Sequence, residues 1–113
     1  MTKQLSILLA ALWMVLGCAA FPASRPARQL REVTFDFEGQ AKSVCITGDF
    51  NQWAPDSHCL QPNQGIWSIR LRLPLGPIHY AFVVNGKEWV LDPKALFVES
   101  DGFGRQNSVV MIE

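Results

Sequence analysis

From residue 31 onward, apolar side chains recur at every second position, and this alternation limits the possible folds more than any other feature of the sequence. Successive side chains of a β-strand point to opposite faces of its sheet, so a period of two predicts strands with one buried face. No stripe with the helical period of 3.6 follows the first twenty residues. The clearest alternating run covers 67–73, with apolar residues at Trp67, Ile69, Leu71 and Leu73.

Shorter alternating runs extend this pattern through the rest of the region. They predict strands over 33–37, 44–47, 78–84, 88–91 and 109–112, with a further short strand around Leu60. Residues 94–105 are expected to form a looser segment. Turn-forming residues separate the runs at 38–40, 62–65, 74–77 and, most strongly, at Asn85-Gly86. About seven short strands with a turn every ten or so residues predict an all-β fold, a single antiparallel β-sandwich.

The first seventeen residues have the composition of an export signal. Lys3 supplies a positive start, Leu5 to Leu16 form an apolar run interrupted by Ser6, and small residues follow at 17–20. The run is about a dozen residues long, whereas a membrane-spanning helix needs about 20. We therefore expect a cleaved signal peptide at 1–17, an anchor site and tether at 18–30, and the sandwich domain at 31–113.

The junction Val15-Leu16-Gly17-Cys18 resembles the bacterial lipobox, although Leu16 is bulkier than the residue usually found there. This resemblance implies that Cys18 is acylated and becomes the new N-terminus. The absence of aspartate at Ala19 implies sorting to the outer membrane, and hence an exported lipoprotein of the bacterial cell envelope that faces the periplasm or the surface. The alternative is ordinary cleavage after Ala20, which would discard Cys18.

Cleavage before Cys18 would leave two other cysteines, Cys45 and Cys59. An even pair in an oxidising compartment predicts a disulfide, and two separate buried thiols are the alternative. Cys45 has the opposite parity to Val44 and Ile46. A bond would therefore require Cys59 to approach the face of the sheet that points away from the core.

Charge and reactive side chains exclude several classes of function. Ten basic and ten acidic residues give zero net charge and form no basic block, so no nucleic-acid partner is expected. His58 and His79 lack metal-ligand spacing and are expected to be ordinary surface residues. Asp49 and Asp92 are better suited to turns or caps than to the paired carboxylates of a glycosidase. We therefore expect no catalytic residues, no metal and no cofactor.

Three aromatic residues lie where the core pattern does not require them. Trp67, Tyr80 and Phe82 fall at core positions. In contrast, Trp53 lies in a polar loop, Trp89 lies beside the Asn-Gly turn, and Phe103 lies between two glycines. A large apolar side chain in such a place either fills the edge of the core or faces water for a purpose.

A family resemblance covers about residues 33–112. Gly48-Asp49-Phe50-Asn51-Gln52-Trp53 resembles the G-x-F-N-x-W motif of the glycogen-binding modules of AMP-activated protein kinase β subunits (carbohydrate-binding module family 48). Related early-set domains precede the catalytic barrel of glycogen branching and debranching enzymes. Four further segments match in order, at 73–76, 80–86, 89–93 and 107–110.

This resemblance implies an immunoglobulin-like (early-set) sandwich that binds α-1,4-glucan on one face. It assigns sugar stacking to Trp53 and Trp89, a flanking hydrophobic contact to Phe103, and a hydrogen bond with a sugar hydroxyl to Asn107. The kinase modules carry a lysine where this chain has Ala81, so one hydroxyl donor of the family is missing.

Two functions remain open from the sequence. The first is a non-catalytic domain that binds α-glucan (glycogen or maltodextrin) on an exported lipoprotein tethered to a membrane. The alternative is an envelope structural or protein-interaction module that keeps the fold without sugar binding and contacts an envelope protein partner. An enzyme is a distant third.

Overall fold

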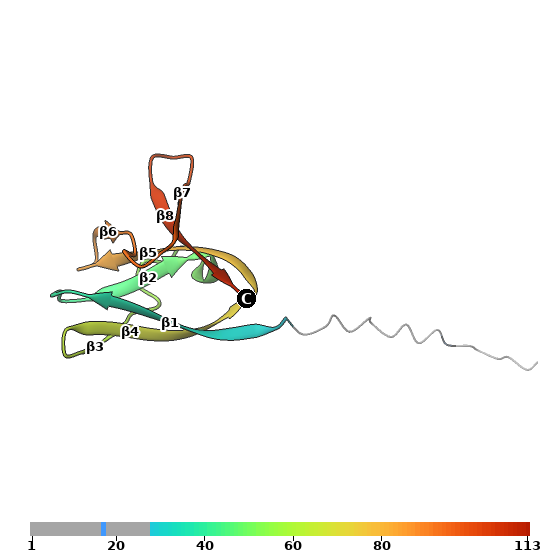
Figure 1. Ribbon diagram of the computed structural model, residues 1–113, viewed down its shortest axis with the longest axis horizontal. Helices are drawn as coiled ribbons and strands as arrows, with labels where there is room; N and C mark the ends of the chain where they lie inside the picture. The colour runs from blue at the N-terminus through green and yellow to red at the C-terminus, as the bar shows by residue number, and fades with distance from the viewer. Residues whose placement is uncertain (1–16, 18–27) are drawn as a thin grey trace, which may run out of the picture.

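A computed structural model describes Gly17 and residues 28–113 (Figure 1). The expected signal peptide, Cys18 and most of the tether therefore lie outside the described residues. Within the described part, no helix has the length and apolar character needed to cross a membrane.

Three strands form the first sheet, sheet A, in the order β1-β4-β3. Its strands are β1 (Leu30–Glu38), β3 (Gln61–Asn63) and β4 (Ile66–Pro74). The long antiparallel pair β1 and β4 places Phe35 opposite Ile69 and Phe37 opposite Trp67. Because cross-strand partners share a face, the alternation in both sequences produces one continuous apolar face.

Five strands form the second sheet, sheet B. The path is β2 (Val44–Gly48), β5 (Gly76–Val84), β8 (Gln106–Ile112) and β7 (Phe97–Ser100), and β6 (Glu88–Val90) also pairs with β5. Phe82 pairs with Ile46 of β2 and with Val90 of β6, so β6 and β8 lie along the same side of β5. The last residue of β6, Val90, and the start of β8 are thereby brought to one region of the sheet.

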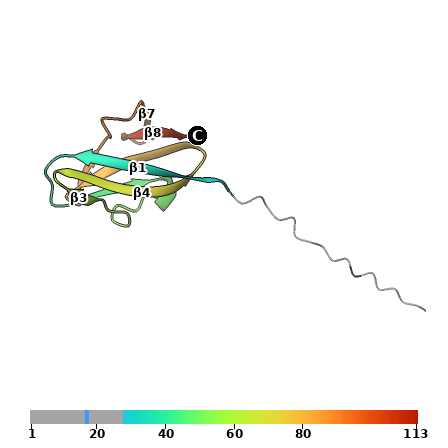
Figure 2. The same cartoon turned by 60° about the horizontal axis from the view of Figure 1, so that its bottom comes forward.

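The two sheets face each other as separate layers (Figures 1 and 2), and the core lies between them. The ring of Phe35 from sheet A meets Tyr80 from sheet B edge to face, with centroids 4.8 Å apart. Trp67, Tyr80 and Phe82 are all buried, as their sequence parity predicted. The predicted antiparallel, immunoglobulin-like β-sandwich is confirmed.

Both ends of the domain lie at the same end of the sandwich. Leu30, the first residue of β1, pairs with Pro74, and Ile112 near the end of β8 pairs with Gly76, two residues further along the chain. Figure 1 shows the C-terminus beside the start of β1.

Two elements differ from the sequence prediction. Residues 97–100, expected to be a looser segment, form strand β7, and residues 61–63, partly expected to be a turn, form β3. Every residue of both strands is exposed, so no buried alternation marks them. The expected Asn85-Gly86 turn is present, with φ values of 55° and 75°.

The predicted disulfide between Cys45 and Cys59 is confirmed, with Cα atoms 3.8 Å apart. Cys59 reaches the free side of β2, where Ile46 N–H donates to His58 O and Leu60 N–H donates to Val44 O, both at 2.8 Å. The bond lies on the face away from the core, as the parity of Cys45 required.

Candidate functional site

The candidate site lies on the outer face of sheet B. Trp89 pairs with Val83, which pairs with Cys45, so all three side chains share a face. Phe82 and Ile46, the next residues along these strands, are fully buried in the core. The tryptophan therefore projects from the side of the sheet that faces away from sheet A.

Gly48 permits the loop between β2 and Trp53 to pass close to strand β5. A Cβ atom at this position would overlap the backbone oxygen of His79 and lie 2.8 Å from the ring of Phe50. The backbone of Gly48 is extended, so the requirement is for space and not for an unusual dihedral angle. Any larger residue would push the loop away from the sheet.

Asn51 holds this loop together through its side-chain amide. Its Oδ1 accepts a hydrogen bond from Gly48 N–H at 3.0 Å, and its Nδ2 donates to Ile46 O at 3.0 Å and to Ala54 O at 3.4 Å. One amide therefore satisfies backbone groups on both sides of the short 3₁₀ turn η1 (Asp49–Asn51).

Trp53 is held in an unfavourable backbone conformation. Gln52 and Trp53 have φ values of 56° and 61°, in the left-handed region, which costs an L-residue about 1–2 kcal/mol. The N–H of Trp53 donates to Gly48 O at 3.1 Å and closes the loop. Backbone strain of this kind concentrates at binding and active sites, where the surrounding structure enforces it.

The two tryptophans come together as a pair. The rings of Trp53 and Trp89 have centroids 5.9 Å apart and planes inclined by 18°, and both residues are half-buried. Trp89 Nε1 donates to Gln106 O at 3.0 Å, which fixes its ring against the start of β8. Residues 36 positions apart in sequence thus present two nearly parallel indole rings.

Phe103 stands at the tip of the hairpin between β7 and β8, where 93% of it is exposed. Gly102 and Gly104 flank it with φ values of 82° and 96°. Asp101 Oδ1 accepts hydrogen bonds from the N–H groups of Phe103 at 2.6 Å and Arg105 at 3.1 Å. The hairpin is therefore internally bonded around an aromatic side chain that faces solvent, and Figure 1 shows it standing away from the sandwich.

A single concavity of about 430 Å³, called here the tryptophan concavity, is lined by Trp53, Trp89, Asp101, Phe103, Arg105 and Asn107. All four residues that the sequence assigned to sugar binding are among them. Asp101 and Arg105 were missed, because a charged residue in a polar loop gives no pattern that distinguishes it from other surface residues. The guanidinium of Arg105 lies over the ring of Trp89, with Cζ 4.4 Å from its centroid.

Asn107 is a buried polar residue that lines the concavity. The residue is 7% exposed, and its Oδ1 is buried with no hydrogen-bond partner among the described residues. Thr47 and Ala81 pair with each other on the same outer face, and both are fully buried. Ala81 therefore supplies no polar group at the position where the family pattern has a lysine.

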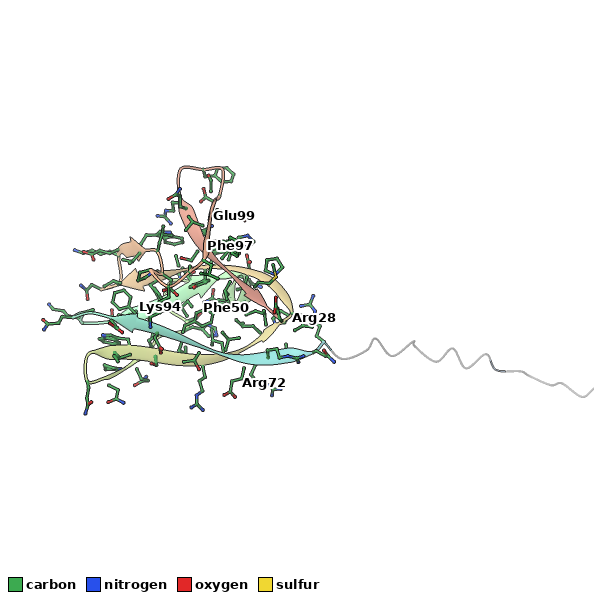
Figure 3. All side chains as sticks on the ribbon, in the orientation of Figure 1. Arg28, Phe50, Arg72, Lys94, Phe97 and Glu99 are labelled. Carbon is green, nitrogen blue, oxygen red and sulfur yellow. A yellow bond between two sulfur atoms is a disulfide. The ribbon has the colours of Figure 1, made fainter. Side chains whose placement is uncertain are left out.

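His79 connects the loop that follows β2 to strand β7, contrary to the expectation of an ordinary surface residue. Its Nδ1 lies 2.7 Å from Asp49 Oδ2 and its Nε2 lies 2.6 Å from Glu99 Oε2. The hydrogen bond to Asp49 is the main cause that raises the pKa of His79, and Glu99 adds to it. Asp49 begins the loop that leads to Trp53, and Glu99 pairs with Asn107 across β7 and β8. The imidazole of His79 therefore links these two segments (Figure 3 marks Glu99).

A larger concavity, about 500 Å³, opens between β1 and β8 and contains none of the predicted site residues. Tyr80 and Asp92 are among its lining residues, and the Tyr80 hydroxyl donates to Asp92 Oδ2 at 2.7 Å. Burial is the main cause that raises the pKa of Tyr80. Asp92 also accepts from Lys94 N–H at 2.9 Å, which gives it the turn role expected from the sequence.

The described residues contain no group of three His, Cys, Asp or Glu side chains placed to hold a metal ion. His79 meets two carboxylates, but they lie at opposite nitrogens of its ring. The concavity itself contains one carboxylate, Asp101, whereas glycosidases use two that flank the scissile bond.

A family model and two related proteins match nearly the same part of this chain. A family model described as the glycogen recognition site of AMP-activated protein kinase matches residues 31–113. The chain is 31% identical over 90 residues to protein PTST homolog 2, chloroplastic, of Arabidopsis thaliana (80% of this chain, 16% of that protein). It is 32% identical over 89 residues to the 5'-AMP-activated protein kinase subunit beta-2 of Mus musculus (79% of this chain, 32% of that protein).

Two further comparisons concern enzymes. A 1,4-alpha-glucan branching enzyme of Desulfitobacterium hafniense (strain Y51) is 42% identical over 66 residues, which is 53% of this chain and 10% of the enzyme. Among solved structures, the maltogenic amylase from S. marinus superposes with a TM-score of 0.62 at 20% identity, over 73% of this chain and 13% of the amylase. The chain thus spans a third or less of each of these proteins.

Proposed function

The chain belongs to the family of the glycogen recognition site of AMP-activated protein kinase, and from that premise we propose that its domain binds α-1,4-glucan without catalysing a reaction. The observation that carries this proposal is the tryptophan concavity, which gathers Trp53, Trp89, Phe103 and Asn107 from three separate segments of the chain.

The chemistry of these side chains suits a sugar. The C–H groups on the faces of a pyranose ring pack on indole as other apolar surfaces do. An amide such as that of Asn107 both donates and accepts, and so matches a hydroxyl group. Phe103, exposed at the hairpin tip, would flank the bound chain. A shallow site leaves much of a flexible sugar in water, so we expect a Kd on the order of 10–1,000 μM.

We further propose that the domain is displayed on an exported lipoprotein. The lipobox-like junction at Cys18 supports this, and residues 18–30 would act as the tether between the acylated cysteine and the domain. The disulfide of Cys45 and Cys59 is compatible with an oxidising compartment such as the bacterial envelope.

Replacing Trp53 or Trp89 by alanine tests the sugar site. Each change should remove stacking worth about 1–3 kcal/mol, which is roughly a 5- to 150-fold loss of affinity for maltoheptaose. Isothermal titration of the isolated 28–113 domain with maltoheptaose measures this loss. Phe97→Ala is the matched control, because Phe97 is an exposed aromatic residue of β7 outside the concavity (Figure 3).

Thermal melts of the same variants separate binding from folding. Half-buried rings should cost less stability on removal than the roughly 3–5 kcal/mol of a fully buried aromatic residue. A wild-type domain that binds no α-glucan would contradict the proposal. It would favour the alternative, an envelope structural or protein-interaction module of the same fold.

A further inference from the structure

We propose that Arg105 is a sugar-contacting residue of the tryptophan concavity. In the free domain its guanidinium covers Trp89, and when a sugar ring stacks there the guanidinium turns to donate hydrogen bonds to the glucan hydroxyls. This inference rests on the proposed function and assigns a role to a residue that no sequence motif of the chain includes.

The geometry places Arg105 at the ring. Its Cζ lies 4.4 Å from the centroid of Trp89, and the residue lines the concavity together with both tryptophans. Its backbone is fixed on both sides, because its N–H donates to Asp101 Oδ1 at 3.1 Å and its carbonyl accepts from Asp101 N–H at 2.9 Å. The side chain therefore starts from a defined point at the rim.

The guanidinium has donors to spare. Arg105 is the single basic residue among those that line the concavity. Across residues 28–113, no carboxylate oxygen lies within ion-pair distance of it. An arginine carries five N–H donors in a planar fork and cannot accept, so hydroxyl oxygens are natural partners.

Other donors in the concavity are less accessible. Trp89 Nε1 is already bonded to Gln106 O. Asn107 is 7% exposed, and Ala81, fully buried on the adjacent strand, has no side-chain donor. Polar recognition of a ligand at the rim therefore depends mainly on Arg105.

Displacing the guanidinium from the indole costs little. A cation–π contact at an exposed site is among the weaker interactions of a protein, whereas hydrogen bonds from a charged donor are among the stronger ones. Replacing the cation–π contact by hydrogen bonds from the guanidinium to the sugar, together with sugar stacking on the freed ring of Trp89, favours the bound state.

Three substitutions test the proposal in the 28–113 domain by titration with maltoheptaose. Arg105→Ala and Arg105→Met should each weaken binding about 5- to 20-fold, because both remove the donors. Arg105→Met retains an unbranched side chain that can pack on Trp89. Arg105→Lys should give an intermediate loss, since it keeps the charge but loses the fork. Arg72→Ala, an exposed arginine on sheet A (Figure 3), is the control and should bind like the wild type.

The outcomes distinguish this role from the alternatives. Wild-type affinity in Arg105→Met would show that the side chain only packs on the ring, and tighter binding in Arg105→Ala would make it a cover that opposes the sugar. Either result overturns the inference while the proposed function stands. A wild-type domain that binds no α-glucan, with both tryptophans intact, would overturn the proposed function and this inference with it.

Discussion

At Gly48 the absence of one Cβ atom decides whether the loop that carries Trp53 can form. The backbone oxygen of His79 occupies the space that a side chain would need. Asn51 then bonds the backbone on both sides of the loop, and Trp53 takes up the strain of a left-handed conformation. The G-x-F-N-x-W motif therefore has a separate physical reason at each of these three residues.

His79 gives the domain a pH dependence with a definite sign. Asp49 and Glu99 hold both nitrogens of the imidazole, and the pKa of His79 is raised in the folded state. Protonation is thus favoured by folding, so this contribution is complete below the ordinary pKa of about 6.5 and is lost as the pH rises through the folded value. Because the group is partly exposed, we expect a loss of about 1 kcal/mol or less.

The measurement is chemical denaturation of wild type and His79→Gln at several pH values between 5 and 9. The free energy of unfolding of the wild type should fall with rising pH relative to the variant, because glutamine does not titrate. Parallel curves for the two proteins would contradict the assigned role of His79.

Among the elements, the disulfide secures the segment that carries Trp53. Cys45 and Cys59 are 14 residues apart, and Trp53 lies inside the ring that they close. Without the bond, the segment 58–60 would be held to β2 by two backbone hydrogen bonds. A ring of this size contributes about 3 kcal/mol in the chain-entropy model.

Cys45→Ala combined with Cys59→Ala should therefore lower the free energy of unfolding by about 3 kcal/mol. Urea denaturation with and without a reducing agent measures this. Reductant should destabilise the wild type to a similar extent and leave the double variant unaffected. Equal stability of oxidised and reduced wild type would rule out this contribution.

Sequence reasoning recovered the elements whose alternation is tied to burial. Strands β4 and β5 were predicted because their apolar residues face the core, and the Asn85-Gly86 turn was predicted from its dihedral requirements. Strand β7 was missed because all four of its residues are exposed and it pairs with β8 alone. An exposed edge strand has no buried face to impose a pattern.

The same distinction applies to the candidate site. Trp53, Trp89, Phe103 and Asn107 were predicted from a motif and from aromatic residues outside the core pattern. Arg105 and His79 were not, because their contacts depend on strand pairing. His79 meets its partners at separations of 30 and 20 residues, and Arg105 reaches Trp89 only because β6 and β8 share one side of β5.

At the scale of the whole molecule, the resemblance of residues 15–18 to the bacterial lipobox predicts a lipid anchor on Cys18. Mass spectrometry of protein extracted from membranes should find an acylated N-terminal Cys18, and Cys18→Ser should release the protein from the membrane fraction. A mature N-terminus at Phe21 in the soluble fraction would contradict the prediction and support ordinary cleavage after Ala20.

The shared position of the two ends of the domain has a practical consequence. Leu30 and Ile112 adjoin the start of β5, whereas Trp89 pairs with Val83, seven residues further along the same strand. At about 3.3 Å per strand residue, that separation is roughly 23 Å. Immobilisation on a sensor chip, or fusion to a reporter protein, through either end would therefore leave the indole rings unobstructed. The domain is therefore suited to use as an attached affinity reagent, because its fold directs the indole rings away from the point of attachment.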